Sequence, residues 1–124
     1  MFQIYIIGSK IRPEIYVGMT TQALKTRLKQ HIYYSGGTRL NYNICSSHRI
    51  IQNTDRSDLF IKLIGVFSNR SDAEMTEYMI IQLTKHTINV KRTSKTITST
   101  PDHFNAVYLN CKPMITLLNQ RGPV

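Results

Sequence analysis

The chain has 124 residues, of which 41% are hydrophobic, and this suits one domain with a modest core. Lys and Arg number 16 against 7 Asp and Glu, so the net charge is +9 and favours a polyanionic partner, most often nucleic acid. No apolar stretch is long enough to span a bilayer, and no long basic amphipathic helix is evident, so we expect no membrane partner.

The cysteines and the N-terminus predict an intracellular protein. Cys45 and Cys111 are far apart in the chain and have no metal-binding spacing, which is typical of reduced thiols. Residues 2–7 are apolar, but this run is too short for the apolar region of a signal peptide and no basic region precedes it. We therefore expect the protein in the cytoplasm or nucleus.

The first elements in the chain form a predicted β-hairpin. Residues 2–7 and 15–19 are rich in β-branched and aromatic side chains, and residues 8–14 contain turn formers. Side chains alternate between the two faces of a strand. Tyr5 and Tyr16 can therefore project from the same side of the hairpin, although tyrosine also favours strands for packing alone.

A helix and a strand are expected after the hairpin. Thr20 or Thr21 could cap a helix that runs to about Tyr34. Residues 41–52 could form a second, short helix. Residues 59–67 are strongly apolar and predict a strand, which we expect at the centre of a small sheet.

The first helix carries two polar side chains beside its apolar stripe. Leu24, Leu28 and Ile32 form the stripe. Arg27 and His31 flank it at i,i+4 spacing, which places both on one face of the helix. Each residue alone is typical of a solvated surface, but together they indicate a shared target.

Glu77 lies at an unexpected position in the helix predicted for residues 72–85. The apolar stripe of that helix consists of Ala73, Ile80, Ile81 and Thr84. At about 100° per residue, Glu77 falls in the middle of this stripe. A buried carboxylate is normally neutralised, paired or bound to a metal ion. Glu74 has a simpler explanation, because with Ser71 it fits a capping box.

The composition changes towards the C-terminus. Residues 87–90 predict a short extended segment, and residues 91–100 read as a flexible basic arm rich in Ser and Thr. After Pro101 apolar residues return, as a tail that packs on the domain or docks on a partner. We expect a domain over residues 1–90, with residues 91–124 as an arm and tail packed on it.

These residue types match the needs of phosphodiester hydrolysis. The carboxylate of Glu77 could hold a divalent cation, and Arg27 could neutralise charge on a phosphoryl oxygen. A tyrosine or His31 could orient or deprotonate the attacking water. A polarising ion, a positioned nucleophile and charge neutralisation are the parts that this reaction requires.

In this pattern the chain resembles the GIY-YIG nuclease superfamily. That group includes phage and intron-encoded homing endonucleases, some restriction enzymes and the incision subunit of bacterial excision repair. The resemblance covers residues 1–90 and departs from the family at Gln3, which replaces a glycine, and at Val17, which replaces an isoleucine. The matching residues are Gln3-Ile4-Tyr5, Tyr16-Val17-Gly18, Arg27, His31, Glu77 and Asn89.

The resemblance implies an α/β (α+β) fold with a small, mainly antiparallel three-stranded sheet flanked by helices. It implies an endonuclease that cleaves DNA with one magnesium or manganese ion per active site. Tyr5 would activate or orient water, and His31 would assist proton transfer. Tyr16 would position phosphate and water, and Arg27 would stabilise the transition state. The ordinary pKa of a phenol, near 10, is high for a base, but Arg27 and the ion would lower it.

The remaining site residues concern metal and DNA. The resemblance makes Glu77 the sole protein ligand of the ion, and Asn89 fixes the edge of the site through hydrogen bonds. Basic side chains elsewhere are expected to contact the phosphate backbone and to add salt-sensitive affinity. They are Lys10, Lys25, Lys29, Arg49, Lys91, Arg92 and Lys95.

Two other functions compete with nuclease activity. One is a catalytically inactive module of the same fold that only binds nucleic acid. The other is a protein-interaction domain whose apolar tail docks on a partner. The chain could act as a monomer or a homodimer, and its small form fits a nuclease of a virus or mobile element by analogy only.

Overall fold

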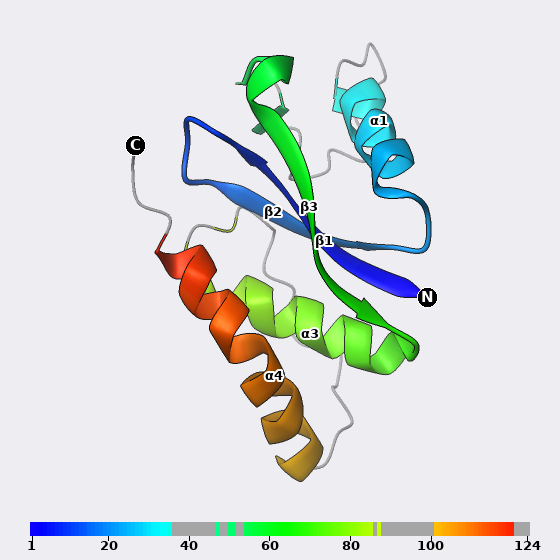
Figure 1. The fold of residues 1–124 in the computed structure, drawn as a ribbon, viewed down its shortest axis with the longest axis vertical. Helices are drawn as coiled ribbons and strands as arrows, with labels where there is room; N and C mark the ends of the chain where they lie inside the picture. The colour runs from blue at the N-terminus through cyan, green and yellow to red at the C-terminus, as the bar shows by residue number, and fades with distance from the viewer. Residues whose placement is uncertain (36–46, 48–49, 52–53, 86, 88–100, 121–124) are drawn as a thin grey trace.

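The computed structural model describes residues 1–35, 47, 50–51, 54–85, 87 and 101–120. At its centre is an antiparallel sheet of three strands in the order β2-β1-β3. Helices pack against this sheet, which confirms the predicted α/β fold (Figure 1). The strands are β1 (Phe2–Ser9), β2 (Ile15–Thr20) and β3 (Leu59–Phe67), and the described helices are α1 (Leu24–Ser35), the 3-10 turn η1 (Arg56–Asp58), α3 (Arg70–Leu83) and α4 (Pro101–Asn119).

Strand β1 is buried on both of its faces. Ile4 and Ile6 point towards the core that includes side chains of α3 and α4. Tyr5 and Ile7 point to the opposite face, and all four side chains are at most 2% exposed. Figure 1 shows α1 on one side of the sheet and the α3–α4 pair on the other. This double cover explains why β1 is apolar almost without interruption.

Strand β3 lies at an edge of the sheet, so the prediction that residues 59–67 form the central strand is wrong. Leu63 and Val66 are 41% and 44% exposed. The register shifts between Ile4 and Tyr5 of β1, which leaves Ile64 as an extra residue on β3. An apolar edge strand and an apolar central strand look alike in sequence, and only the pairing distinguishes them.

Helix α1 begins later than the threonines suggest. The Thr20 hydroxyl accepts a hydrogen bond from the Gln22 amide (3.0 Å), and the helix starts at Leu24. Thr20 therefore stabilises the turn before the helix instead of capping it. The Gln3 side chain donates to the Gln22 carbonyl (2.8 Å) and ties β1 to the same turn. Gln3, which departs from the family pattern, thus has a structural function here.

Most of the second predicted helix, over residues 41–52, lies outside the described residues. The described part is Ser47 with Ile50 and Ile51, all buried. The Ser47 carbonyl accepts hydrogen bonds from the amides of Ile50 and Ile51, both at 3.1 Å. These bonds tie Ser47 to Ile50 and Ile51.

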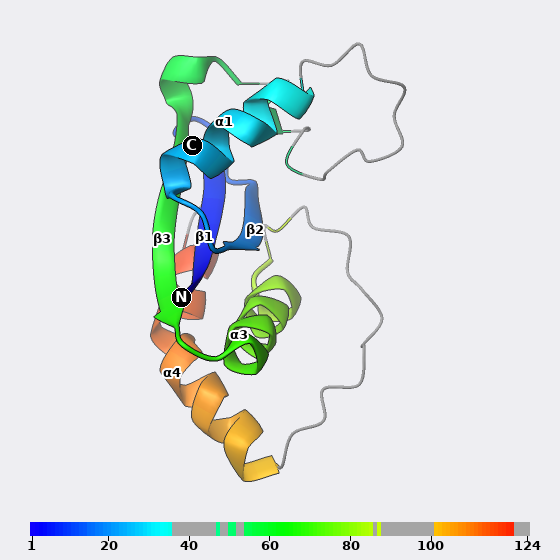
Figure 2. The same ribbon diagram turned by 90° about the vertical axis from the view of Figure 1, so that its right-hand side faces the viewer.

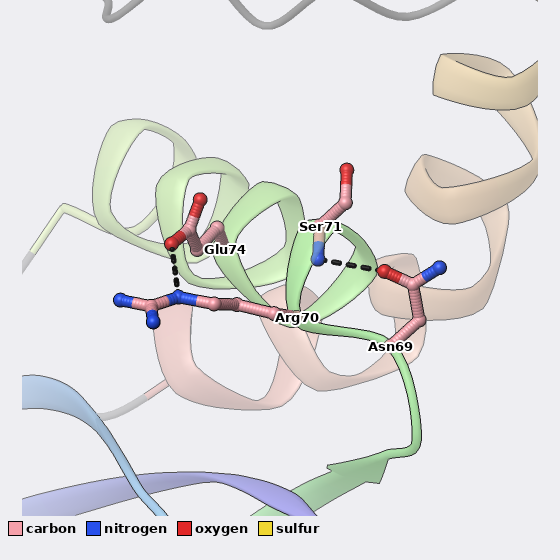
Figure 3. Close-up of polar contacts among 4 residues, drawn as sticks. All are labelled: Asn69, Arg70, Ser71 and Glu74. Atoms are coloured by element: carbon pink, nitrogen blue, oxygen red, sulfur yellow. Dashed lines mark hydrogen bonds and ion pairs between the residues drawn. The ribbon is translucent and has the colours of Figure 1, made fainter.

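Helix α3 begins at Arg70, so the predicted capping box of Ser71 and Glu74 is wrong. The N-cap is Asn69, whose side chain accepts a hydrogen bond from the Ser71 amide (2.7 Å, Figure 3). Glu74 instead forms an exposed ion pair with Arg70 (2.9 Å), as Figure 3 also shows. Asn and Ser are both good N-caps, and the sequence contains both within three residues.

The apolar tail forms α4, which lies against α3 (Figures 1 and 2). Pro101 opens the helix, where its missing amide costs nothing. Asn119 then links the ends of the two helices, because its side chain accepts from the Lys85 amide (2.8 Å) and donates to the Leu83 carbonyl (3.0 Å). The buried residues of α4 are Val107, Cys111, Ile115 and Leu118. No helix among the described residues has the length and apolarity needed to cross a membrane.

Candidate active site

The two tyrosines lie on the same face of the sheet. Tyr5 of β1 pairs with Gly18 of β2, and Ile7 pairs with Tyr16. Paired residues of an antiparallel ladder share a face, so both rings project from the side that α1 covers. Their centroids are 6.4 Å apart. The hairpin therefore arranges the tyrosines as its alternation predicts.

Gly18 provides the space that the Tyr5 ring occupies. A Cβ atom at position 18 would lie 2.4 Å from the Tyr5 hydroxyl oxygen and 3.0 Å from the Tyr16 ring. Real Cβ atoms essentially never show a contact as short as the first, and the second is tighter than most real ones. A glycine is therefore required at position 18 for close approach, independently of its backbone conformation.

Helix α1 brings Arg27 and His31 to the Tyr5 hydroxyl. His31 Nε2 lies 2.8 Å from the Tyr5 oxygen, and Arg27 Nε donates to the same oxygen over 3.2 Å. The i,i+4 spacing thus directs both side chains to one atom. The His31 ring also meets the Tyr16 ring edge-on, with centroids 5.3 Å apart. Four of the six predicted catalytic residues therefore lie together.

His31 is neutral in the folded protein at neutral pH. Its side chain is buried, with 3% of the residue exposed. Burial, reinforced by the positive charge of Arg27, lowers the pKa of His31 to about 4. A neutral imidazole has one nitrogen that accepts and one that donates, so it can receive a proton from a neighbouring hydroxyl.

Two further side chains hold this cluster, and the sequence did not point to either. The Ser47 hydroxyl lies 2.7 Å from His31 Nδ1, on the far side of the imidazole from Tyr5. Gln30 accepts a hydrogen bond from Arg27 Nη1 (3.0 Å). The Gln30 contact follows from its i,i+3 spacing to Arg27. No local pattern relates Ser47 to His31, because the two residues are 16 positions apart.

Glu77 occupies the rim of the buried face of α3, so its predicted place in the middle of the stripe is wrong. The buried residues of the helix are Ala73, Met75, Thr76, Met79 and Ile80. This arc extends to the side that α4 covers, which the periodicity of α3 alone could not show. Glu77 is half-buried at one boundary of the arc. A half-buried carboxylate is accessible to a metal ion and its water ligands.

The described residues are compatible with a metal site that has one protein ligand. Among these residues, no three His, Cys, Asp or Glu side chains are placed to hold an ion together. A divalent ion bound by one or two carboxylates, with water and phosphate as further ligands, is common in phosphate chemistry. The Glu77 carboxylate has hard oxygen atoms of the kind that such an ion prefers.

The other predicted site residues lie on the surface or outside the described part of the chain. Lys10 is exposed in the hairpin turn, and Lys25 and Lys29 are exposed one turn apart on α1. Thr87 forms a parallel bridge with Ile15, which places the segment after α3 beside the strand of Tyr16. The predicted residues outside the described part are Arg49, Asn89, Lys91, Arg92 and Lys95.

Comparison with known proteins agrees with this geometry. The family model of the GIY-YIG catalytic domain matches residues 1–92 of the 124. This segment contains the sheet, α1 and α3, together with all six predicted catalytic residues. No curated protein and no solved structure gives a significant match to the chain. The matched segment is most of the chain, and the protein therefore belongs to the GIY-YIG nuclease superfamily.

Proposed function

We propose that this protein is a divalent-metal-dependent endonuclease that hydrolyses DNA phosphodiester bonds. GIY-YIG domains are in general endonucleases, and such nucleases usually use divalent metal ions. The observation that carries the proposal is the Tyr5 hydroxyl held between Arg27 and His31, at 3.2 and 2.8 Å. A tyrosine, a guanidinium and a neutral imidazole joined at one oxygen form a unit that can accept a proton.

In the proposed reaction a water oxygen attacks phosphorus and the bond to the leaving oxygen breaks. As the Tyr5 oxygen takes a proton from the attacking water, it passes its own proton to His31 Nε2, so that no free phenolate has to form. The leaving oxygen takes a proton from bulk water, and His31, whose pKa is low, returns its proton to solvent. Arg27 stabilises negative charge that develops on the Tyr5 oxygen, because its charged donor is hydrogen-bonded to that oxygen, while the same charge favours the return of the proton from His31. The same guanidinium can neutralise charge on the phosphoryl oxygens in the transition state.

Tyr16 and Arg27 form the accessible side of this cluster. Tyr5 is 0% exposed, whereas Tyr16 and Arg27 are half-buried. Substrate would therefore approach from the side of Tyr16 and Arg27, and the attacking water would reach the Tyr5 oxygen where Arg27 contacts it. This arrangement supports Tyr16 as the residue that orients phosphate and water.

Glu77 is the residue that would hold the ion, with Asn89 as the hydrogen-bonding residue at the edge of the site. When bound, a magnesium or manganese ion would polarise the phosphoryl oxygens. The Glu77 carboxylate is half-buried, so it can present oxygen atoms to an ion that keeps most of its water ligands.

The excess of positive charge supports DNA as the partner. A net charge of +9 attracts a phosphate backbone, and exposed Lys25 and Lys29 lie on the helix that also carries Arg27 and His31. A catalytically inactive binding module would share this charge. Only a cleavage assay separates the two functions.

The test is incubation of supercoiled plasmid with the protein in magnesium, manganese or EDTA. We expect nicking or linearisation with either ion and none with EDTA. Glu77→Ala should abolish cleavage and leave DNA binding largely intact. Glu74→Ala is the matched control, because it removes an exposed glutamate one turn earlier in α3 and should cleave normally.

Three outcomes would count against the proposal. Cleavage that persists in EDTA would reject metal dependence. Activity retained by Glu77→Ala would reject its function as a metal ligand. Binding without cleavage of plasmid, branched and flap DNA alike would favour the inactive module. The ratio of nicked to linear product would report whether one or two strands are cut.

A further inference from the structure

Ser47 has no function in the chemistry described so far, yet it contacts the imidazole directly. It is 0% exposed, and its hydroxyl lies 2.7 Å from His31 Nδ1. The opposite nitrogen, Nε2, faces the Tyr5 hydroxyl at 2.8 Å. A continuous line of polar atoms therefore runs from Ser47 through His31 to Tyr5 and Arg27.

Only the Arg27 hydrogen bond has a direction that the residue types alone determine, and the other two directions depend on the tautomer of His31. Arg27 can only donate, so the Tyr5 oxygen accepts from Arg27 Nε. The Tyr5 hydrogen is buried and needs an acceptor, and the nitrogen at 2.8 Å supplies one when it is unprotonated. In the tautomer that lets Nε2 accept from Tyr5, His31 carries its hydrogen on Nδ1, and the Ser47 oxygen at 2.7 Å is placed to accept it.

We propose that Ser47 is a positioning residue that accepts the Nδ1–H of neutral His31 and so stabilises the tautomer that the Tyr5–Arg27 contact favours, in which Nε2 can accept the Tyr5 proton. This inference rests on the proposed nuclease function for its catalytic consequence, but the tautomer itself is independent of that function. The tautomer of a histidine is set by the hydrogen bond that its other nitrogen makes.

The surroundings of Ser47 support such a function. Its carbonyl accepts the amides of Ile50 and Ile51, both at 3.1 Å, which ties Ser47 to two buried residues. Among the described residues that face the imidazole are Tyr5 and Arg27 at one end, Tyr16 across the ring and Ser47 at the other end.

The first measurement is the pair of imidazole ¹⁵N chemical shifts of His31 in the full chain without DNA or metal. The signals are assigned by their loss in His31→Gln. At neutral pH we expect a protonated Nδ1 and an unprotonated Nε2. In Ser47→Ala the buried Nδ1–H loses its acceptor, so we expect the hydrogen to move partly or fully to Nε2. A protonated Nε2 in the unsubstituted protein would overturn the proposal.

The second measurement is the rate of plasmid cleavage. Loss of a residue that orients a functional histidine typically costs about 10- to 100-fold. We expect a loss of this size in kcat for Ser47→Ala, with little change in KM, and recovery in Ser47→Thr, which restores a hydroxyl. An unchanged rate, or an unchanged tautomer, in Ser47→Ala would overturn the positioning function. If Ser47→Ala does not fold, Ser47→Cys, a weaker acceptor of similar size, carries the same two measurements.

Failure of this inference can be distinguished from failure of the proposed function. If the unsubstituted protein cleaves no DNA, the nuclease proposal and the catalytic consequence of Ser47 both fail, while the ¹⁵N shifts still decide the tautomer. If it cleaves DNA and Ser47→Ala cleaves equally well, only the inference about Ser47 fails.

Discussion

The Tyr5 hydroxyl is the atom on which most of the site depends. Strand β1 supplies it, and α1 supplies both of the side chains that contact it. The ring is 0% exposed, so its position is fixed by packing as well as by hydrogen bonds. Tyr16 lies beside it and is the more exposed of the two tyrosines.

The two tyrosines can be compared by removing one hydroxyl at a time. We expect Tyr5→Phe to lower the cleavage rate by about 100-fold or more, because the proposed proton transfer to His31 is lost. Tyr16→Phe should weaken cleavage less, since it removes a group that orients the reactants. Single-turnover rates on plasmid would measure both effects. A larger loss in Tyr16→Phe than in Tyr5→Phe would assign the function of base to Tyr16.

Gly18→Ala should damage the site without touching any polar group. The new methyl would lie 2.4 Å from the Tyr5 hydroxyl oxygen, so Tyr5 must leave its contacts with Arg27 and His31. We expect a loss of cleavage at least as large as in Tyr5→Phe. Overpacking should also lower the unfolding free energy by about 1–3 kcal/mol. Thermal unfolding and plasmid cleavage would measure the two effects.

Gly65→Ala is the control for this substitution. Its methyl would meet the edge of the half-buried Phe67 ring at 2.9 Å, on the edge strand β3. That ring is the far end of a side chain that can turn, so cleavage should be retained. Equal losses of activity in Gly18→Ala and Gly65→Ala would show a general effect on the sheet instead of a local effect on Tyr5.

His31 should make the stability of the fold depend on pH. Its pKa is about 4 when folded, below the ordinary value of 6.5. Between these values the unfolded chain binds a proton that the folded chain does not, so acid favours unfolding. The contribution is complete above about pH 6.5 and is lost towards pH 4, by at most about 1.4 kcal/mol per unit.

Urea unfolding at about pH 7.5 and about pH 5.5 would measure this effect. The unfolding free energy of the unsubstituted protein should be lower at about pH 5.5 than at about pH 7.5. In His31→Gln the fall should be smaller, because the buried titrating group is absent. An equal fall in both proteins would contradict the assigned state of His31.

At the scale of elements, α4 is joined to α3 by a packed apolar face and by one side chain at the end. Asn119 forms two hydrogen bonds with the C-terminal end of α3, at 2.8 and 3.0 Å. These bonds satisfy a carbonyl and an amide that the helix itself leaves unpaired. Because α3 carries Glu77, the position of α4 affects the helix that would hold the metal.

Asn119→Ala should therefore loosen the α3–α4 pair. We expect a loss of about 1–2 kcal/mol in unfolding free energy, since each exposed hydrogen bond contributes about 0.5–1.5 kcal/mol. Chemical denaturation would measure this loss. Gln120→Ala is the control, because that neighbouring side chain is exposed and should be replaceable without effect. Equal stability of the two variants would show that the Asn119 side chain does not stabilise the α3–α4 pair.

At the scale of the whole molecule, charge should govern DNA affinity. Deleting residues from Lys91 onward is a poor test of the basic arm, because α4 supplies four residues of the core. Substitution to glutamine tests the arm while it preserves the helix. The three residues to replace are Lys91, Arg92 and Lys95.

The triple glutamine variant should bind DNA more weakly and with a smaller dependence on salt. Each lost phosphate contact should reduce the slope of log affinity against log salt by about one. The control variant has glutamine in place of Lys62, Lys85 and Lys112. These residues are exposed, and their replacement removes the same total charge. Fluorescence anisotropy across a salt series would measure the slopes. Equal slopes in the two variants would show that residues 91, 92 and 95 contribute only to the net charge and make no specific contact with the phosphates.

The sequence predicted local features well. Alternation placed Tyr5 and Tyr16 on one face, and i,i+4 spacing directed Arg27 and His31 to one point. It also predicted β3 with its bounds. These features follow from backbone geometry over a few residues, which every strand or helix shares. Helix starts were less certain, since Thr20, Asn69 and Ser71 are all suitable caps.

The tertiary structure decided the features that depend on contacts between distant segments. It made β1 instead of β3 the central strand, and it moved Glu77 from the middle of the buried face to its rim because α4 covers another side of α3. It also brought Ser47 to His31. The sequence by itself determined which residues could do the chemistry, because residue type and local spacing are written in the chain. The burial of a side chain and its contacts with distant residues depend on how the elements pack, and packing is a property of the whole fold.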